Sequence, residues 1–143
     1  MRNYFIIFFL VTLSFVSCER SEINEMQVST DTTLLNGSWR VEQFIEGSID
    51  ETRSFTSVRF RFEANGVFNV LLNNTLIATG SWAFKHNGSH IYIDVPAFAN
   101  EQRAIQQFGE DVYEIHDDWK VISFTTNRLH IKSDEESFML MKE

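Results

Sequence analysis

Cysteine and proline are almost absent from this sequence, which has one residue of each among its 143. A single thiol cannot form an intramolecular disulfide, so the small disulfide-rich secreted folds are excluded. Only six glycines are present, and no repeat of the collagen, coiled-coil or solenoid type is found. Lys and Arg number 12 against 20 Asp and Glu, giving a net charge of −8. An acidic chain repels nucleic acid and anionic lipid headgroups, and we expect neither as a partner.

The long hydrophobic run of the chain lies at its start. Arg2 gives a short positive beginning, and residues 4–16 (YFIIFFLVTLSFV) are apolar apart from Thr12 and Ser14. A helix needs about 20 apolar residues to span a bilayer, so this run is too short and has the length of a signal-peptide core. A buried N-terminal helix is the alternative, which the polar stretch that follows at once disfavours.

The only cysteine stands directly after this run. Phe15-Val16-Ser17-Cys18 resembles the lipobox of bacterial lipoproteins, with Phe15 where Leu is more usual. The resemblance implies cleavage after residue 17, a thioether-linked lipid on Cys18 and acylation of its amine, and two or more chains anchor a protein stably. A free reactive thiol is the alternative. We therefore expect a signal peptide over residues 1–17 and a cell-envelope protein held at the outer membrane through Cys18, its periplasmic or surface face left open.

The segment after the cysteine is polar and aperiodic. Residues 19–33 contain isolated Ile23, Met26 and Val28 without the spacing of a helix or a strand. We interpret residues 18–33 as a flexible tether with an end-to-end distance of roughly 20 Å. The folded domain is expected over residues 34–143.

That domain is patterned as short alternating segments separated by turn signals. Apolar and charged side chains alternate strictly over residues 58–63, and Asn65-Gly66, the strongest sequence signal for a hairpin, follows. The predicted strands are 39–45, 58–63, 67–72, 76–84, 89–95, 119–125, 128–132 and 137–142. About eight sequential antiparallel strands predict an all-β up-and-down barrel. An open sandwich is the alternative, and closure is favoured because it removes exposed strand edges.

Residues 96–118 form a longer excursion between the fifth and sixth predicted strands. Asn100 is suited to cap a short helix there, and Gly109 is suited to end it. The apolar stripe of this helix is Ala104, Ile105 and Phe108.

The motif at the head of the first strand resembles a known family. Asn36-Gly37-Ser38-Trp39 is similar to the G-x-W motif of lipocalins, in which Gly lets the chain bend and Trp plugs the closed end of the barrel. Gly80-Ser81-Trp82, Trp119-Lys120-Val121 and Leu129-His130-Ile131 extend the resemblance to small lipocalin-like lipoproteins of Bacteroidota, over residues 34–143. The chain departs from larger lipocalins because it lacks the T-D-Y signature and the C-terminal helix. The structural residues that the resemblance implies are Gly37, Trp39, Gly80, Trp82 and Trp119.

Strand alternation gives an inward set of mostly large side chains: Trp39, Val41, Val58, Phe60, Phe62, Trp82, Phe84, Ile91, Ile93, Trp119, Val121, Leu129, Ile131, Phe138 and Leu140. Such a set favours a filled core over a roomy cavity. If a cavity exists, we expect its mouth between the loop 46–54 and the excursion. The candidate ligand-binding residues are then Phe60, Phe62, Trp82 and Phe84, with Phe98, Ile105 and Phe108 as a lid.

No catalytic signature is found in the sequence. The four histidines do not share a predicted neighbourhood, and we expect no metal site and no cofactor. Residues 110–118 are dense in carboxylates without the EF-hand spacing, and we interpret them as a solvated acidic loop.

Two functions follow from these observations, both of them non-enzymatic. The first is a membrane-anchored lipocalin-like binding module for a small apolar ligand. The alternative is a protein-interaction module with a filled core, such as a periplasmic or surface inhibitor or an accessory subunit of an envelope complex, whose acidic loops suit a basic partner.

Overall fold

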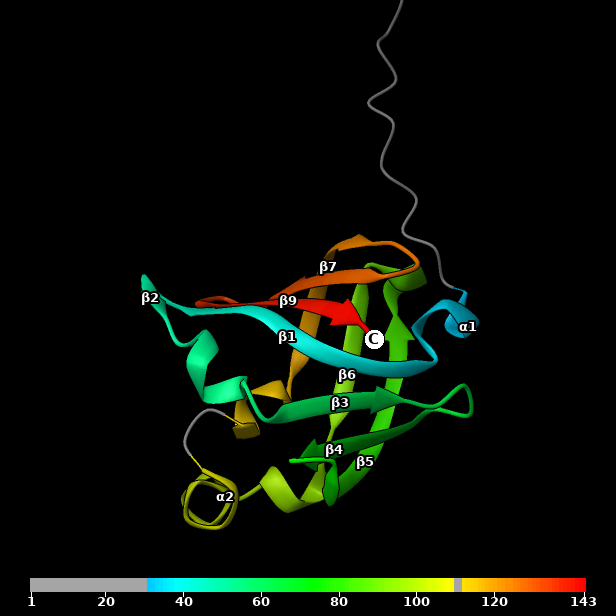
Figure 1. Ribbon diagram of the computed structural model, residues 1–143. Coiled ribbons are helices and arrows are strands. Elements are labelled where there is room, and N and C mark those ends of the chain that lie inside the picture. The colour runs from blue at the N-terminus through cyan, green and yellow to red at the C-terminus, as the bar shows by residue number, and fades with distance from the viewer. Residues whose placement is uncertain (1–30, 110–111) are drawn as a thin grey trace, which may run out of the picture.

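The computed structural model describes residues 31–109 and 112–143 (Figure 1). The predicted signal peptide, Cys18 and most of the predicted tether lie outside the described residues. Within the described ranges, no helix combines the length and hydrophobicity that a membrane crossing requires.

An antiparallel sheet that closes on itself forms the body of the molecule. The strands follow one another in the sheet in nearly the order of the chain, and β1 also pairs with β9. The bounds are β1 (Gly37–Glu46), β2 (Ile49–Asp50), β3 (Val58–Phe62), β4 (Val67–Leu72), β5 (Thr75–Lys85), β6 (His90–Asp94), β7 (Asp118–Phe124), β8 (Arg128–Lys132) and β9 (Glu136–Lys142). Because β2 pairs only with the end of β1, the remaining eight strands make the barrel.

The predicted barrel is confirmed, and the open sandwich is wrong. The pairing of β1 with β9 runs from Trp39 opposite Lys142 to Glu46 opposite Glu136, so the first and last barrel strands meet along most of their length. The predicted strands lie within two residues of the observed ones at each end. The two-residue strand β2 was not predicted, since two residues are too few to show alternation.

One end of the barrel is covered by helix α1 (Thr32–Leu35), and we call it the α1 end (Figure 1). The Asp31 side chain accepts a hydrogen bond of 2.9 Å from the backbone N–H of Thr33, which caps this helix inside the segment interpreted as tether. Leu35 is buried, and the indole N–H of buried Trp39 donates to its carbonyl at 2.8 Å. Trp39 therefore ties the entering chain to the barrel.

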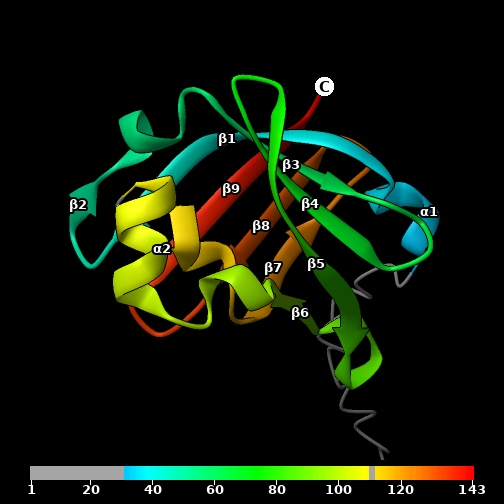
Figure 2. The same cartoon turned by 90° about the horizontal axis from the view of Figure 1, so that it is seen from below.

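The other end is covered by the connection between β6 and β7, residues 95–117, which we call the excursion (Figure 2). It contains the 3₁₀ helix η3 (Pro96–Phe98), helix α2 (Glu101–Phe108) and the 3₁₀ helix η4 (Val112–Ile115). Helix α2 is confirmed: the Asn100 side chain accepts from the N–H of Arg103, and Gly109 follows with a φ of 97°. The indole N–H of Trp119 donates to the carbonyl of Ile115 at 3.0 Å, so a second tryptophan holds this end.

Aromatic rings occupy the middle of the barrel. The ring centroid of Phe138 lies 4.3 Å from that of Phe44, 5.2 Å from those of Phe55 and Trp119, and 6.1 Å from that of Phe60. These rings come from four barrel strands (β1, β3, β7 and β9) and from the 3₁₀ helix η1 (Thr52–Phe55). The described interior thus holds aromatic side chains in contact across the barrel, as the predicted set of large inward residues requires.

The inward set predicted by alternation is buried, except that Phe84 is only half-buried. The alternation did not identify Phe44, which is fully buried. The register of β1 against β9 shifts between Val41 and Gln43, so the side chain facing the core moves from odd to even positions there. A β-bulge of this kind leaves no mark in a simple alternation of apolar and polar residues.

We expect Trp39→Ala to lower the free energy of unfolding by about 3–5 kcal/mol, because it removes a large buried side chain and leaves the carbonyl of Leu35 without its donor. Chemical denaturation followed by circular dichroism measures the change. Leu76→Ala, at a side chain that is 57% exposed, is the control and should change stability little. An unchanged denaturation midpoint for the Trp39 variant would show that Trp39 does not close this end of the barrel.

Candidate functional site

The candidate ligand-binding residues inside the barrel pack against one another. Phe60 and Phe62 are fully buried, and the Phe62 ring lies 5.6 Å from that of Trp82. The Trp82 ring lies 5.7 Å from that of half-buried Phe84, which in turn contacts Phe124 at 5.9 Å. Phe68 joins Phe60 to Phe62, with ring centroids 5.6 Å and 4.9 Å away, so the structure brings these predicted residues together in a continuous chain of ring contacts. Their role in binding a ligand stays a prediction.

The predicted lid residues form a second apolar group, at the excursion end. Phe98 is buried, and its ring centroid lies 5.3 Å from that of Phe108. Ile105 and Phe108 are half-buried. Among the described residues, no ring contact joins this pair to the chain of rings around Trp82. The excursion is thus a packed cover, and its binding role also stays a prediction.

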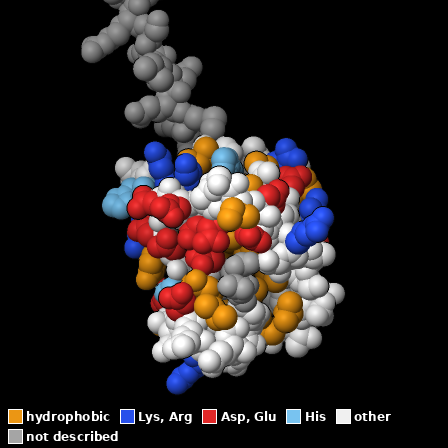
Figure 3. All heavy atoms as spheres, turned by 90° about the vertical axis from the view of Figure 1, so that its left-hand side faces the viewer, with side chains coloured by type: hydrophobic (Ala, Val, Ile, Leu, Met, Phe, Trp, Pro, Cys, Tyr) orange, Lys and Arg blue, Asp and Glu red, His pale blue; other side chains and the backbone are white. Residues whose placement is uncertain are grey.

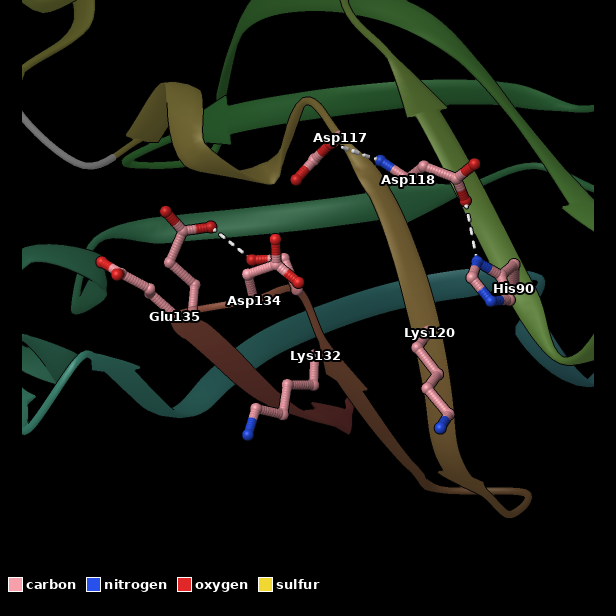
Figure 4. Close-up of a pocket in the computed structure, with 9 residues that line it drawn as sticks. His90, Asp117, Asp118, Lys120, Lys132, Asp134 and Glu135 are labelled. Atoms are coloured by element: carbon pink, nitrogen blue, oxygen red, sulfur yellow. Dashed lines mark hydrogen bonds and ion pairs between the residues drawn. The ribbon is translucent and has the colours of Figure 1, made fainter.

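A polar groove of about 690 Å³ lies on the outer face of the barrel (Figure 4). Strands β6, β7 and β8, the turn between β8 and β9, and the start of β9 supply its walls. The volume suits a small ligand or a peptide segment, but charged side chains replace the apolar lining that is typical of small-molecule sites. The groove therefore suits a charged ligand better than an apolar one.

Basic side chains line one part of this groove. His90 on β6 lies opposite Lys120 on β7, and Lys120 lies opposite Lys132 on β8. Among the described residues, neither Lys120 nor Lys132 has an ion-pair partner. The carboxylate of Asp118 pairs with other residues: it lies 3.2 Å from His90 Nδ1 and 3.7 Å from Lys85 Nζ.

Carboxylates line the rest of the groove. Asp117 begins this wall, and Asp134 and Glu135 stand on the turn between β8 and β9 (Figure 4). Glu136 accepts a hydrogen bond of 2.9 Å from the Ser133 hydroxyl. Figure 3 shows the left-hand side of the molecule in Figure 1, and Asp and Glu side chains gather on that face. Apart from Asp118, which is paired with His90, the carboxylates stand at Asp117 and around the turn between β8 and β9, whereas the basic groups stand on β6, β7 and β8.

A cluster of glutamates stands beside the groove. Glu46 and Glu136 lie directly opposite each other across β1 and β9. Burial raises the pKa of Glu114 to about 7, and repulsion from Glu136 and Glu46 acts in the same direction. A hydrogen bond from Tyr113 opposes the rise. The side chain of Glu114 therefore binds a proton close to neutral pH.

The prediction of a solvated acidic loop over residues 110–118 is wrong for its middle part. Val112 and Ile115 are buried, and they hold η4 against the barrel. Apolar residues three apart on a helical turn share one face, which outweighs the local density of charge. The flanking Glu110 and Asp111 lie outside the described residues.

The rings of His86 and His90 lie 5.1 Å apart, whereas His116 and His130 make separate contacts. His116 Nδ1 accepts a hydrogen bond of 2.8 Å from the N–H of Val95, and His130 Nε2 lies 2.9 Å from the Ser137 hydroxyl. Burial lowers the pKa of His130, and the charge of Lys132 acts in the same direction. No group of three or more His, Cys, Asp or Glu side chains in the described ranges is placed to hold a metal ion.

Sequence reasoning did not identify the groove. One signal was available: Lys120 and Lys132 each alternate with inward-facing residues on neighbouring predicted strands, which puts both on the outer face. The register shift between Val121 and Ser123 then brings them directly opposite each other. The acidic wall had no such signal, because it depends on how the turn of Asp134 and Glu135 meets the start of β7.

Comparison with known proteins gives the fold. No protein-family model and no curated protein matches the chain. Among solved structures, a lipocalin-like protein from Bacteroides uniformis is 20% identical, with a TM-score of 0.55, covering 77% of this chain and 99% of that one. An uncharacterized protein from Bacteroides eggerthii is 14% identical, with a TM-score of 0.53, covering 76% and 99%.

A third solved structure, a DUF4847 family protein from Bacteroides vulgatus, is 12% identical, with a TM-score of 0.50, covering 80% of this chain and 98% of that one. These identities are too low to carry a function from one chain to another, and fold alone does not determine activity. The closed barrel and these neighbours together give this chain a lipocalin-like fold.

We expect the free energy of unfolding to fall as the pH rises from about 4.5 to about 7, the range between the ordinary and the raised pKa of Glu114. A raised pKa means that the folded state binds the proton more tightly, so this stabilisation is present at low pH and is lost as the carboxylate ionises. Glu114→Gln should flatten that part of the stability profile, measured by denaturant titration at each pH. Glu63→Gln, near the α1 end, is the matched control, and a profile unchanged by Glu114→Gln would contradict this assignment.

Proposed function

We propose that this chain is a non-catalytic binding protein of the bacterial cell envelope that docks a basic segment of a partner protein in its outer groove. The observation that carries the proposal is the contrast between the two candidate sites. Aromatic side chains pack against one another inside the barrel, whereas the concave surface outside it is lined by charged groups. A binding role is therefore best supported on the outer surface.

The sign of the charge supports a basic partner. Five carboxylates line the groove (Asp117, Asp118, Asp134, Glu135 and Glu136), against the two lysines and His90. Carboxylates gathered on one face attract Lys and Arg side chains, steer their approach and discriminate against acidic competitors. The chain as a whole carries a net charge of −8, which acts in the same direction at longer range.

An exposed apolar side chain stands next to this acidic surface. Ile49 on β2 is 60% exposed and lies directly opposite Glu46, which is itself opposite Glu136. An apolar contact surrounded by charged groups is a common arrangement at protein interfaces. The partner segment that fits best therefore carries an apolar residue beside its basic ones.

We also propose that the protein is anchored in a membrane through a lipid on Cys18. The support is the lipobox resemblance at Phe15-Val16-Ser17-Cys18. The described chain begins at α1, at the end of the barrel opposite the excursion (Figure 1). A tether that leaves from the α1 end would keep the groove clear of the lipid headgroups and accessible to a partner.

The hypothesis that a small apolar ligand binds inside the barrel and the proposed function predict different masses for the purified protein. Native mass spectrometry of the purified protein should show the mass of the chain alone if the ring contacts fill the interior. A co-purifying apolar molecule would instead support the interior site and overturn the proposed function.

We expect Glu135→Gln to weaken binding of a short Lys- and Arg-rich peptide by about fivefold, the effect of roughly 1 kcal/mol from one exposed charge. Fluorescence anisotropy with a labelled peptide measures the affinity, which should also fall as the salt concentration rises. Glu63→Gln removes the same charge near the α1 end and should leave the affinity close to that of the unaltered protein. Equal losses in both variants would point to a non-specific attraction.

We expect Cys18→Ala to abolish lipid attachment, so that the protein is no longer retained in the membrane fraction. Metabolic labelling with palmitate, followed by fractionation of the cells, measures both effects. Ser17→Ala keeps a small residue before the cysteine and should retain the label. Label retained by the Cys18 variant would show that the anchor has been misassigned.

A further inference from the structure

The two lysines of the groove are placed where their charges repel. Lys120 and Lys132 lie directly opposite each other in the hairpin of β7 and β8, and both are exposed. Like charges directly opposite each other in an antiparallel pair destabilise a sheet. His90, opposite Lys120 on the next strand, adds a third basic group to the same row. An arrangement of this kind is stabilised when an anion lies between the charges.

Several other basic residues of the barrel wall bind a partner within the barrel. Arg59 bonds to Glu143 at 2.7 Å, and Arg128 bonds to Glu42 at 3.0 Å. Lys142 donates to the carbonyl of Leu34 at 2.9 Å. Carboxylates also stand in the groove, yet among the described residues none is bound to either lysine. The amines of Lys120 and Lys132 are therefore available to a ligand.

The carboxylates near the lysines are held away from them. Asp118 is directed to His90 and Lys85, and Glu136 accepts from Ser133. In Figure 4 the side chains of Lys120 and Lys132 extend from neighbouring strands in different directions, and both point away from Asp134 and Glu135. The groove thus offers a cationic part and an anionic part to one ligand.

We infer that Lys120 and Lys132 form a subsite for a carboxylate, so that the ligand of the groove is a basic peptide segment that also carries a carboxylate next to its basic side chains. This inference rests on the proposed function, since it uses the same groove. A carboxylate fits better than a phosphate, because the surrounding Asp and Glu side chains repel a dianion more strongly than a single charge. The carboxylate belongs either to a peptide C-terminus or to an acidic side chain.

Paired peptides test the subsite with the mature protein. Ala-Lys-Lys-Ala with a free C-terminal carboxylate, the same peptide amidated, and an amidated Ala-Lys-Lys-Asp are titrated by calorimetry. We expect the free acid or the Asp peptide to bind about tenfold more tightly than the amidated Ala-Lys-Lys-Ala, as one charge-assisted contact provides. The tighter of the two identifies the source of the carboxylate. Equal affinities for all three peptides overturn the subsite.

Variants separate the subsite from the rest of the groove. Lys120→Gln with Lys132→Gln should remove the preference for the carboxylate while retaining the amidated peptide, whose attraction to the acidic wall is unaffected or stronger. The double variant should fold, since it relieves a repulsion between strands. Arg61→Gln, an exposed position on β3, is the control and should keep the preference. A preference that survives the double variant overturns the assignment.

Failure of the proposed function is distinguishable from failure of the subsite. If none of the peptides binds, the proposed function is wrong, and titration with sodium acetate against sodium chloride at the same ionic strength still decides the subsite. Nuclear magnetic resonance shifts specific to acetate at Lys120 and Lys132 support it. Shifts equal in the two salts overturn it.

Discussion

The structure depends on the pairing of the first and last barrel strands. Opposite positions on β1 and β9 place Phe44 against Phe138 and Val41 against Leu140, so closing the sheet also brings the largest rings to the middle. An eight-stranded barrel is narrow enough for ordinary side chains to occupy its middle. Closing the sheet thus brings these rings into contact in the interior, while the charged groove lies on the outer surface.

Much of the fold could be predicted from the sequence, because strict alternation at positions such as 58–63 and turn signals such as Asn65-Gly66 are local properties. The prediction from alternation missed Phe44 because the register of β1 shifts before this residue. A further register shift lies between Val121 and Ser123 on β7. Helix α2 was recognised from its caps. Helix α1 was not, since four residues carry no periodicity of their own.

The candidate site could be predicted far less well. Its walls come from separate strands and turns, and its charge pattern arises only when the turn of Asp134 and Glu135 approaches Asp117. Of the aromatic residues predicted to line a ligand site, Phe60, Phe62 and Trp82 are buried inside the barrel, and their role in binding stays a prediction. A large apolar side chain that points inward has the same sequence signature whether it lines a cavity or fills one.

The position of the C-terminal residue has a further consequence. The N–H of Glu143 donates to the carbonyl of Ser38 at 2.9 Å, so this residue sits beside the start of β1, near the segment through which the chain enters the barrel. Any polypeptide attached after Glu143 would emerge on the same side as the entering chain. Reporter proteins or affinity handles fused there would lie beside the entering chain and at the other end of β9 from the turn of Asp134 and Glu135, which makes the C-terminus a suitable place for labels such as dyes or cross-linkers.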